Sequence, residues 1–474
     1  MNWTLALPEI VLALSALALL VGGVIPRRDT TFPVSLGAIG ALLLAAVLAM
    51  GQPDGTAFNG QYASDAFTRF AKVLVLLGSA AALVLSLDWN AREGLARFEH
   101  PILVLTAALG SVVMLSAGDL MALYLGLELL SLSQYVLAAS NRDSARSAEA
   151  GLKYFVLGAL ASGLLLYGAS LVYGYAGTTG LAGIAAALSS GQPQPPGLVV
   201  GLVFVVAALC FKVAAFPFHM WTPDVYEGAP TPVVAFFTTG PAVAAVALLT
   251  RVVAGPFADL AGQWTGVLWF ASLGSMVLGS VAAIGQRNVK RLMAYSSIGN
   301  VGYSVMGLAV GSEAGLRGTL IYLAIYLAMT LGAFAVIVAL RRGGRALEGV
   351  DDLAGLGRTD PAMALGMAVF MFSLAGIPPL AGFFSKLYVF LAAVQGGFWV
   401  LAVVGVLASV VSAYYYLRVV KVMYFDAPPA LATDPRPFGL SVVLAGTGLF
   451  TALFFLAPAP LVAAAGNAVS ALLR

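Results

Sequence analysis

Apolar runs separated by short polar segments fill most of the chain. A helix needs about 20 consecutive apolar residues to cross the hydrocarbon core of a bilayer. Counting runs of this length predicts about fourteen membrane-spanning helices. The predicted spans are 6–25, 31–50, 67–87, 100–116, 119–140, 150–175, 198–221, 231–254, 264–285, 291–310, 316–340, 361–394, 398–424 and 438–460. This pattern is typical of an all-α polytopic membrane protein.

Two predicted spans combine helix-breaking prolines with one deep lysine. Lys212 lies about 20 Å into its run, at about 1.5 Å of rise per residue, and Pro217 follows it. Lys386 follows the Pro-Pro pair at 378–379. Proline cannot donate a backbone hydrogen bond, so the helix is expected to break beside each lysine. Because a cation at this depth costs at least about 2.5–3.5 kcal/mol, the two lysines predict ion sites. A lysine that snorkels from a kinked helix is the alternative.

The chain is expected to contain two units that repeat each other. Each unit has five predicted spans, from the fourth to the eighth and from the ninth to the thirteenth, and contains one Pro-broken helix with a lysine. Because five is odd, the second unit must enter the membrane from the opposite side, as an inverted repeat. The predicted divisions are 1–97 (three N-terminal helices), 98–256 (first repeat), 257–426 (second, inverted repeat) and 427–474 (C-terminal helix).

The loops differ in their content of basic residues. Loops after odd-numbered spans carry Arg27, Arg28, Arg92, Arg97, Arg142, Arg146, Arg287, Lys290, Arg291, Arg341, Arg342, Arg345, Arg358, Arg418, Lys421 and Arg436. Loops after even-numbered spans carry only Arg69, Arg251 and Arg317, with Lys72 just inside the third span. Basic loops face the cytoplasm, so both termini are predicted to lie on the outer side. The uncharged loop 176–197 is expected to form a surface turn or a short helix.

Composition excludes a soluble protein and argues against a redox role. The chain is 61% hydrophobic and 9% charged, with a mean hydropathy of +0.96. A single cysteine, Cys210, excludes an internal disulfide, and no Cys/His cluster could hold an iron–sulfur centre or zinc. The glycines between Gly299 and Gly307 are interpreted as helix-packing positions. The segment MNWTLALPE lacks a basic region, so the first run is expected to be a span and not a cleaved signal.

Further charged residues inside the spans extend the candidate site. Glu128 lies in the middle of span 119–140 and is the natural partner of Lys212. While the two are paired the lysine keeps its proton, and separating them favours its release. His219 can exchange protons near neutral pH. The pair and the histidine together suggest a proton relay.

Other positions leave two interpretations open. Lys153 is either a snorkelling residue or part of the relay, and Lys290 is either part of an interfacial basic turn or a relay group. The triplet Tyr414, Tyr415 and Tyr416 is expected to form an interfacial aromatic belt, with the alternative that one of them hydrogen-bonds water near Lys386.

Three segments carry a resemblance to a known family. FKVAAFPFHMWTPDVYEGAPTPVVAFF, NVKRLMAYSSIGNVGY and SLAGIPPLAGFFSKLYVF resemble the antiporter-like membrane subunits of respiratory complex I, most closely the subunit N family of bacterial NADH-quinone oxidoreductase. Neighbouring subunit M usually has a glutamate at the position of Lys386, and subunit L has a long C-terminal lateral helix that is not expected here. The resemblance covers nearly the whole chain.

The resemblance implies a proton translocase coupled to electron transfer from NADH to quinone. FMN, the iron–sulfur clusters and the quinone would belong to other subunits, and none to this chain. Expected partners are subunit M, small membrane subunits and the lipid of a bacterial inner membrane, with no nucleic acid. The residues that match the family's relay are Glu128, Lys153, Lys212, His219, Lys290 and Lys386.

Two positions depart from the family pattern. Relatives commonly have a lysine where this chain has Ala242, and often a histidine where it has Asn300. Water or Lys290 would then bridge the two halves, or pumping would be impaired. Two other functions stay open: a cation/proton antiporter subunit of the multisubunit (Mrp-like) type, and a non-catalytic membrane scaffold.

Overall fold

The computed structural model describes residues 3–25, 29–189, 195–428 and 433–474. Arg27 and Arg28, which entered the comparison of basic loops, lie outside the described residues, as do residues 190–194 of the predicted outer loop. The rest of that loop contains a short helix, as expected.

Helices make up nearly all of the described chain. The first half contains α1 (Leu7–Val24), α2 (Thr31–Met50), α3 (Ala66–Arg92), α4 (Glu99–Leu115), α5 (Leu120–Ala138), α6 (Ala145–Ala176), α7 (Leu181–Leu188), α8 (Pro196–Lys212), α9 (Thr222–Gly228), α10 (Thr231–Phe237) and α11 (Gly240–Ala254). The second half contains α12 (Ala261–Ala282), α13 (Val289–Val310), α14 (Glu313–Ala339), α15 (Leu356–Thr359), α16 (Pro361–Ala375), α17 (Ala381–Gln395), α18 (Trp399–Phe425), α19 (Phe438–Leu453) and α20 (Ala459–Leu472).

Short 3-10 helices and two small hairpins complete the structure. The 3-10 helices are η1 (Trp3–Ala6), η2 (Phe58–Gly60), η3 (Ala258–Leu260), η4 (Asp351–Leu353) and η5 (Phe454–Leu456). The strands are β1 (Gly55–Ala57) with β2 (Tyr62–Ser64), and β3 (Arg341–Arg342) with β4 (Arg345–Ala346), each pair antiparallel.

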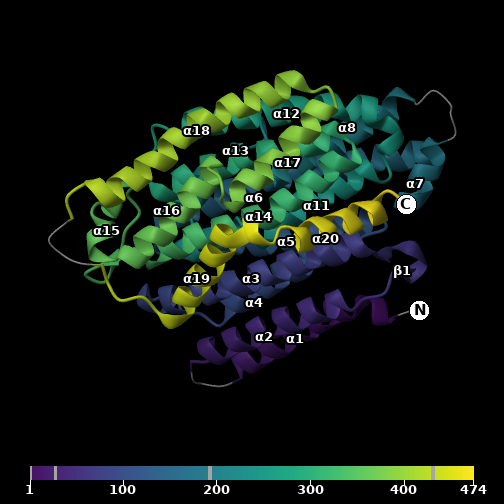
Figure 1. Ribbon diagram of the computed structural model, residues 1–474. Helices are drawn as coiled ribbons and strands as arrows, with labels where there is room; N and C mark the ends of the chain where they lie inside the picture. The colour runs from purple at the N-terminus through teal and green to yellow at the C-terminus, as the bar shows by residue number, and fades with distance from the viewer. Residues whose placement is uncertain (1–2, 26–28, 190–194, 429–432) are drawn as a thin grey trace.

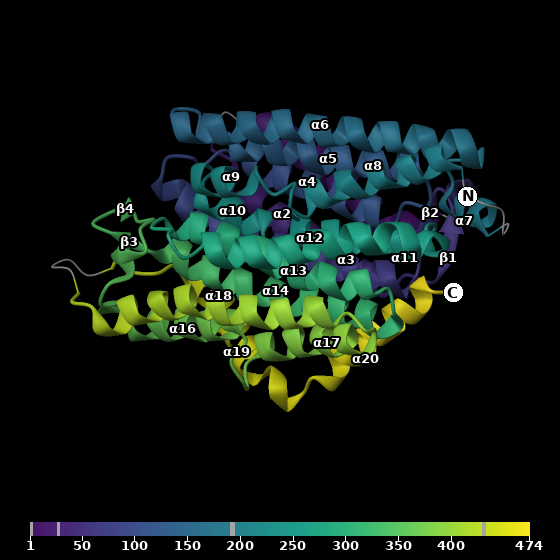
Figure 2. The ribbon, with the colours of Figure 1, turned by 90° about the horizontal axis from the view of Figure 1, so that it is seen from above.

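The long helices lie side by side in one bundle, with both termini at the same end (Figure 1). The hairpin β3–β4 lies at the opposite end (Figure 2). Ten described helical segments are long and apolar enough to cross a membrane, and five further apolar helices are shorter. The prediction of an all-α polytopic membrane protein is therefore confirmed.

The helix break predicted beside Lys212 is present. The span expected at 198–221 ends as a helix at Lys212, five residues before Pro217, and Ala214 adopts a left-handed φ of 59°. The break predicted beside Lys212 is therefore confirmed, and the backbone turns away from the helix already before the proline. The N–H of Phe216, freed by this turn, donates to Ser275 Oγ on α12 at 2.8 Å.

The other breaks include one as predicted and two that the pattern missed. The span 361–394 is split into α16 and α17, as the Pro-Pro pair predicts. The span 231–254 is split between α10 and α11, where Pro241 stands in the first turn of the second piece. The last run does not end at 460, because α20 follows α19 along the bundle (Figure 1).

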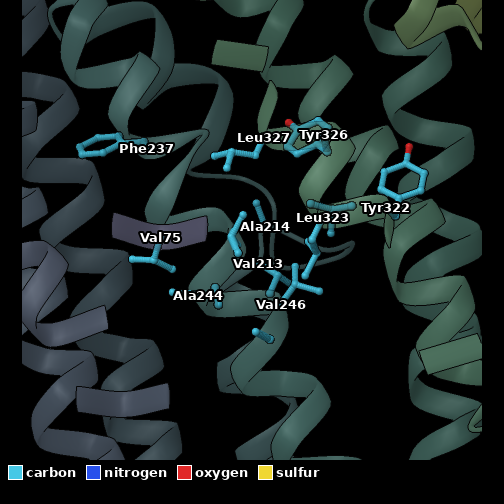
Figure 3. Close-up of a cluster of buried hydrophobic side chains, with 14 of the residues drawn as sticks. Val75, Val213, Ala214, Phe237, Ala244, Val246, Tyr322, Leu323, Tyr326 and Leu327 are labelled. Carbon is cyan, nitrogen blue, oxygen red and sulfur yellow. The ribbon is translucent and has the colours of Figure 1, made fainter. Parts of the chain in front are cut away.

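The break after Lys212 lies in the apolar centre of the bundle. Val213 and Ala214 are surrounded there by Val75 of α3, Val246 of α11 and Leu323 of α14 (Figure 3). In both the α10–α11 segment and α14, 94% of the apolar stretch is buried. The break therefore brings a lysine, and backbone groups that lack partners within the helix, to the most enclosed part of the protein.

Glycines allow α12 and α13 to pack with their backbones in contact. A Cβ placed on Gly279 of α12 would lie 2.5 Å from the backbone nitrogen of Gly299 and 2.7 Å from the backbone oxygen of Tyr295, both on α13. The interpretation of the α13 glycines as packing residues is consistent with this contact.

Gly279→Ala is predicted to destabilise the protein, because the new methyl group meets backbone that cannot move aside. The expected loss is about 1–3 kcal/mol, measured as a lower thermal unfolding midpoint of the purified protein in detergent. Gly266→Ala on the same helix is the matched control, since a Cβ there meets nothing within 4 Å. Equal midpoints for the two variants would contradict the proposed close packing.

Candidate functional site: a buried polar axis

Lys212 is the last residue of α8, and its side chain is surrounded by aromatic rings. Its Nζ donates to Ser131 Oγ of α5 at 2.5 Å. The ring centroids of Tyr135, Tyr154 and Phe211 lie 5.6, 5.9 and 6.0 Å from the Nζ. A cation at a helix C-terminus is favoured by the helix dipole and by ring faces. No carboxylate within ion-pair distance of Lys212 is among the described residues.

Glu128 lies one turn from Ser131 on α5 but is not in contact with Lys212. Its carboxylate accepts a hydrogen bond from Ser162 of α6 and is partly exposed at the side of the bundle. The predicted ion pair is therefore separated in this structure. Its formation and separation remain a prediction.

A small cavity extends from Lys212 toward the second half of the chain. The cavity has a volume of about 30 Å³. Its lining includes Lys212, Gln134, Tyr226, Ala242 and Ser297. A cavity holds a water when it offers about 10–15 Å³ and two or more polar partners. The cavity meets both conditions, although Ala242 contributes no polar group to it.

Beyond the cavity, hydroxyl and amide groups form a hydrogen-bonded network between α13, α14 and α18. Tyr326 donates to Ser297 Oγ at 2.9 Å, and Tyr322 donates to Asn300 Oδ1 at 2.6 Å. The amide of Asn300 donates to the hydroxyl of Tyr416 at 3.3 Å, and this hydroxyl lies 2.5 Å from Ser296 Oγ. These side chains are buried.

The network corrects one expectation from the sequence. Tyr415 and Tyr416 are both about 1% exposed and lie inside the bundle, whereas Tyr414 is 60% exposed. The triplet is therefore not a uniform interfacial belt, because only one of its three rings faces outward. The network was missed because its members are common residues on three separate helices and carry no sequence signal of their own.

Lys386 lies on α17, and the side-chain hydrogen bonds of the described residues do not join it to this network. Its Nζ donates to Ser409 Oγ at 2.7 Å and to the carbonyl oxygens of Leu374 and Ala375 at 2.9 and 3.2 Å. These two carbonyls end α16, where the helix break leaves them without partners in the helix. The Nζ also lies 4.9 Å from the ring centroid of Tyr303. Among the described residues, Lys386 has no acidic partner.

Lys153 joins a cluster of charges at the end of the bundle opposite the termini. Its Nζ lies 2.7 Å from Glu149 and 2.6 Å from Asp224. Arg291 lies 2.8 Å from Asp224 and 2.9 Å from Glu227. Burial raises the pKa of the Asp224 carboxyl, but the hydrogen bonds from Lys153 and Arg291 outweigh burial and hold that pKa below its usual value.

Lys290 is buried, with 2% of its surface exposed, in the first turn of α13. Its Nζ pairs with Glu348 at 2.5 Å and donates to the carbonyl of Ala229 at 3.0 Å. A cavity of about 480 Å³, lined by Lys290, Glu348 and Arg345 among others, adjoins the pair. This burial excludes the interpretation of Lys290 as an exposed interfacial residue.

His219 lies in the segment after the break, stacked on Phe216 with ring centroids 5.7 Å apart. Its Nδ1 has no hydrogen-bond partner among the described residues. The structure therefore does not join His219 to the network of hydroxyl groups.

A buried ion pair near the termini was not predicted. Lys72 of α3, fully buried, lies 2.7 Å from Glu9 of α1 and donates to the Tyr62 hydroxyl at 2.8 Å. The position of Lys72 inside the third apolar run was the signal, but the sequence did not indicate its partner.

Comparison with known proteins assigns the chain to a family. Residues 117–412 match the family model described as NADH:quinone oxidoreductase/Mrp antiporter, TM. The NADH-quinone oxidoreductase subunit N of Granulibacter bethesdensis is 58% identical over 478 residues, covering 100% of both chains. That of Azorhizobium caulinodans is 59% identical over 468 residues, covering 98% of both.

Solved structures share the fold. A chain of respiratory complex I from Thermus thermophilus with bound aureothin superposes with a TM-score of 0.82 at 35% identity, covering 96% of this chain and 98% of that one. A chain of the Mrp complex from Dietzia sp. superposes with a TM-score of 0.88 at 23% identity, covering 100% and 98%. The second likeness concerns the fold alone.

Asp224→Asn is predicted to lower the free energy of unfolding by about 1 kcal/mol, because it removes the negative charge that Lys153 and Arg291 share. The effect is small because all three side chains are partly solvated. The lowered pKa of Asp224 means that its contribution is fully present above the unfolded value of about 3.9 and is lost as the pH falls through the folded value.

The thermal unfolding midpoints of the wild type and Asp224→Asn should therefore differ by a constant amount from pH 8 to about pH 5. This difference should become smaller below about pH 4. Asp259→Asn, at an exposed aspartate near the other end of the bundle, is the control and should change nothing. A difference that narrows between pH 8 and pH 6 would contradict the lowered pKa.

Proposed function

Because the chain belongs to the family of NADH-quinone oxidoreductase subunit N, within the wider NADH:quinone oxidoreductase/Mrp antiporter family, we propose that its buried axis from Lys212 to Lys386 conducts protons. The chain is a membrane subunit of respiratory complex I, an oxidoreductase, and carries the antiporter-like domain of this family. Its own part in the reaction is proton translocation driven by electron transfer in other subunits.

The observation that carries the proposal is the pair of deep lysines without carboxylate contacts among the described residues, with a cavity beside Lys212 and a network of hydroxyl groups between the two lysines. A lysine held by neutral acceptors can gain and lose a proton without breaking an ion pair. Glu128, now bonded to Ser162, is the group whose approach favours the protonated form of Lys212 and whose withdrawal favours release.

The two departures from the family pattern are compensated by neutral groups. A hydroxyl both donates and accepts a hydrogen bond, so Tyr326, Ser297 and cavity water can pass a proton where Ala242 offers no amine. Asn300 donates and accepts at different atoms, so it orders the hydrogen bonds around it but does not titrate. The Tyr416–Ser296 pair beside it supplies the hydroxyl route toward Lys386.

Proton entry is proposed at Lys290. The cavity beside the Lys290–Glu348 pair lies at the arginine-rich end of the bundle, which basic-loop counting assigns to the cytoplasm. Both termini would then lie on the periplasmic side of a bacterial inner membrane. Lys153 lies in the charged cluster at the same end, and His219 lies beyond the α8 break, so both belong to the approaches of the axis.

Fourteen spans result when broken helices are counted together. The composite spans are α8 with the segment after it, α10 with α11, α16 with α17, and α19 with α20. The proposed divisions are three N-terminal helices in 1–97, a repeat in 98–256, an inverted repeat in 257–426 and a last span in 427–474.

The two repeats are supported by matching contacts. A glycine lies at the crossing of the first two helices in each: Gly110 of α4 faces the backbone of α5, as Gly279 of α12 faces α13. A tyrosine ring on α5 lies beside Lys212, and one on α13 lies beside Lys386.

Partners and cofactors follow from the complex. FMN, iron–sulfur clusters and quinone are assigned to other subunits, and the described residues contain no group of three or more His, Cys, Asp or Glu able to hold a metal. Subunit M and small membrane subunits are the proposed neighbours.

The alternative is a cation/proton antiporter subunit of the Mrp-like type. It predicts sodium-dependent transport without an electron donor. No contact among the described residues favours it over the complex I reading.

Tyr416→Phe is predicted to slow proton uptake driven by NADH oxidation in proteoliposomes by at least about fivefold, since a lost hydrogen bond of about 1 kcal/mol interrupts the route beside Asn300. NADH oxidation by a soluble acceptor that takes electrons before quinone should be unchanged. Tyr414→Phe, the same change at an exposed neighbour, is the control. Equal proton uptake in the two variants would rule out the hydroxyl route.

A further inference from the structure

A large groove opens on the side of the bundle where α4, α5 and α6 meet. Its volume is about 680 Å³, within the range of about 300–1,000 Å³ that is usual for small-molecule sites. Figure 2 shows α6 at the outer edge of the bundle, so the groove faces the surroundings of the chain. Its position on the side of the bundle separates it from the enclosed cavity beside Lys212, and the two have no described lining residue in common.

The inner part of the groove is apolar and unoccupied by the chain itself. Val136, Leu152 and Phe155 line it and are 54%, 62% and 50% exposed. All three lie on α5 or α6, within the apolar stretches of these helices. This part of the groove therefore lies at the depth of lipid acyl chains.

The other part of the groove is polar and basic. Arg97 precedes α4 and Arg142 lies between α5 and α6, and both guanidinium groups are exposed with no ion pair or hydrogen bond to any described residue. Asn90 and Ser140 add neutral hydrogen-bonding groups, and Glu99 is the one acidic residue in the described lining. Two unpaired cations against one anion leave an excess of positive charge.

We propose that this groove binds one anionic phospholipid, with its phosphodiester between Arg97 and Arg142 and an acyl chain along Val136, Leu152 and Phe155. Guanidinium groups bind phosphate oxygens in paired hydrogen bonds. The two arginines lie at the end assigned to the cytoplasm, where anionic lipids and basic pockets between helices meet. A neutral lipid would match the apolar wall but would leave the extra charge of the basic rim unmatched.

The test uses the purified complex in nanodiscs that contain either photoactivatable phosphatidylglycerol or photoactivatable phosphatidylcholine. Labelled peptides are mapped by mass spectrometry. Phosphatidylglycerol should label segments 95–103, 136–142 and 151–155 in preference to phosphatidylcholine. The double variant Arg97→Gln, Arg142→Gln should lower this labelling by at least about tenfold, because each arginine is expected to contribute about fivefold. Labelling by phosphatidylcholine should stay unchanged.

Two variants control for charge and folding. Arg287→Gln with Arg358→Gln removes two other exposed arginines from the same end of the bundle and should leave labelling unchanged. Arg97→Lys with Arg142→Lys keeps the charge and should retain part of the labelling. Retained NADH oxidation shows that each complex is assembled.

Equal labelling by the two lipids, or no effect of the Arg97 and Arg142 changes, would show only non-specific boundary lipid and overturn the proposal. Absence of label from either lipid in the assembled complex would mean that a neighbouring subunit covers the groove, which also overturns it. The result does not depend on the proton route, since it is read as labelling and not as pumping.

Discussion

A lysine amine in the centre of a membrane protein must find hydrogen-bond acceptors, and the architecture around Lys212 and Lys386 supplies them. Lys386 finds the two carbonyl oxygens that end α16 and the hydroxyl of Ser409. Lys212, the last residue of α8, donates to the hydroxyl of Ser131 on α5. An unsatisfied backbone group in a bilayer costs several kcal/mol, so the helix breaks are tolerated because the lysines and nearby hydroxyl groups satisfy the atoms that the breaks release. Lys386 and its break therefore stabilise each other, whereas at the break after Lys212 the hydroxyl of Ser275 accepts from the released N–H of Phe216.

This mutual requirement explains how the two halves are connected. Each break brings polar backbone into the apolar centre, and water-sized space beside Lys212 opens toward Ser297 and Tyr226. Between this space and the surroundings of Lys386, the described hydrogen bonds use only hydroxyl and amide groups, without a charged residue. A neutral link does not have to bear the cost of desolvating a charge, and any net charge stays on the lysines at its two ends.

The sequence predicted the elements that depend on composition and local chemistry. Apolar runs placed almost every long helix, and prolines placed the broken ones, because span length and a missing N–H are local properties. Pro217 predicted the break beside Lys212 but not the left-handed turn at Ala214, which has no residue signature. Isolated charges inside apolar runs predicted Lys212 and Lys386 as ion sites, because burying a cation is expensive wherever the chain places it.

What the sequence could not predict are contacts between helices far apart in the chain. Tyr416 meets Ser296 and Asn300 across more than a hundred residues, and its expected place in an aromatic belt was wrong because its side of α18 faces inward. Lys290 looked interfacial in its basic segment, but Glu348 reaches it from another loop. The separation of Glu128 from Lys212 is likewise a property of helix packing and side-chain orientation.

The central claim is that Lys212 and Lys386 serve one continuous pathway. Its most direct test is the number of protons taken up per electron in proteoliposomes containing Lys212→Met, Lys386→Met and the double variant, compared with the wild type. Residues in series act as a unit, so the double variant should lose no more than either single variant. If instead the two losses add, the lysines belong to separate pathways and the hydroxyl network does not connect them.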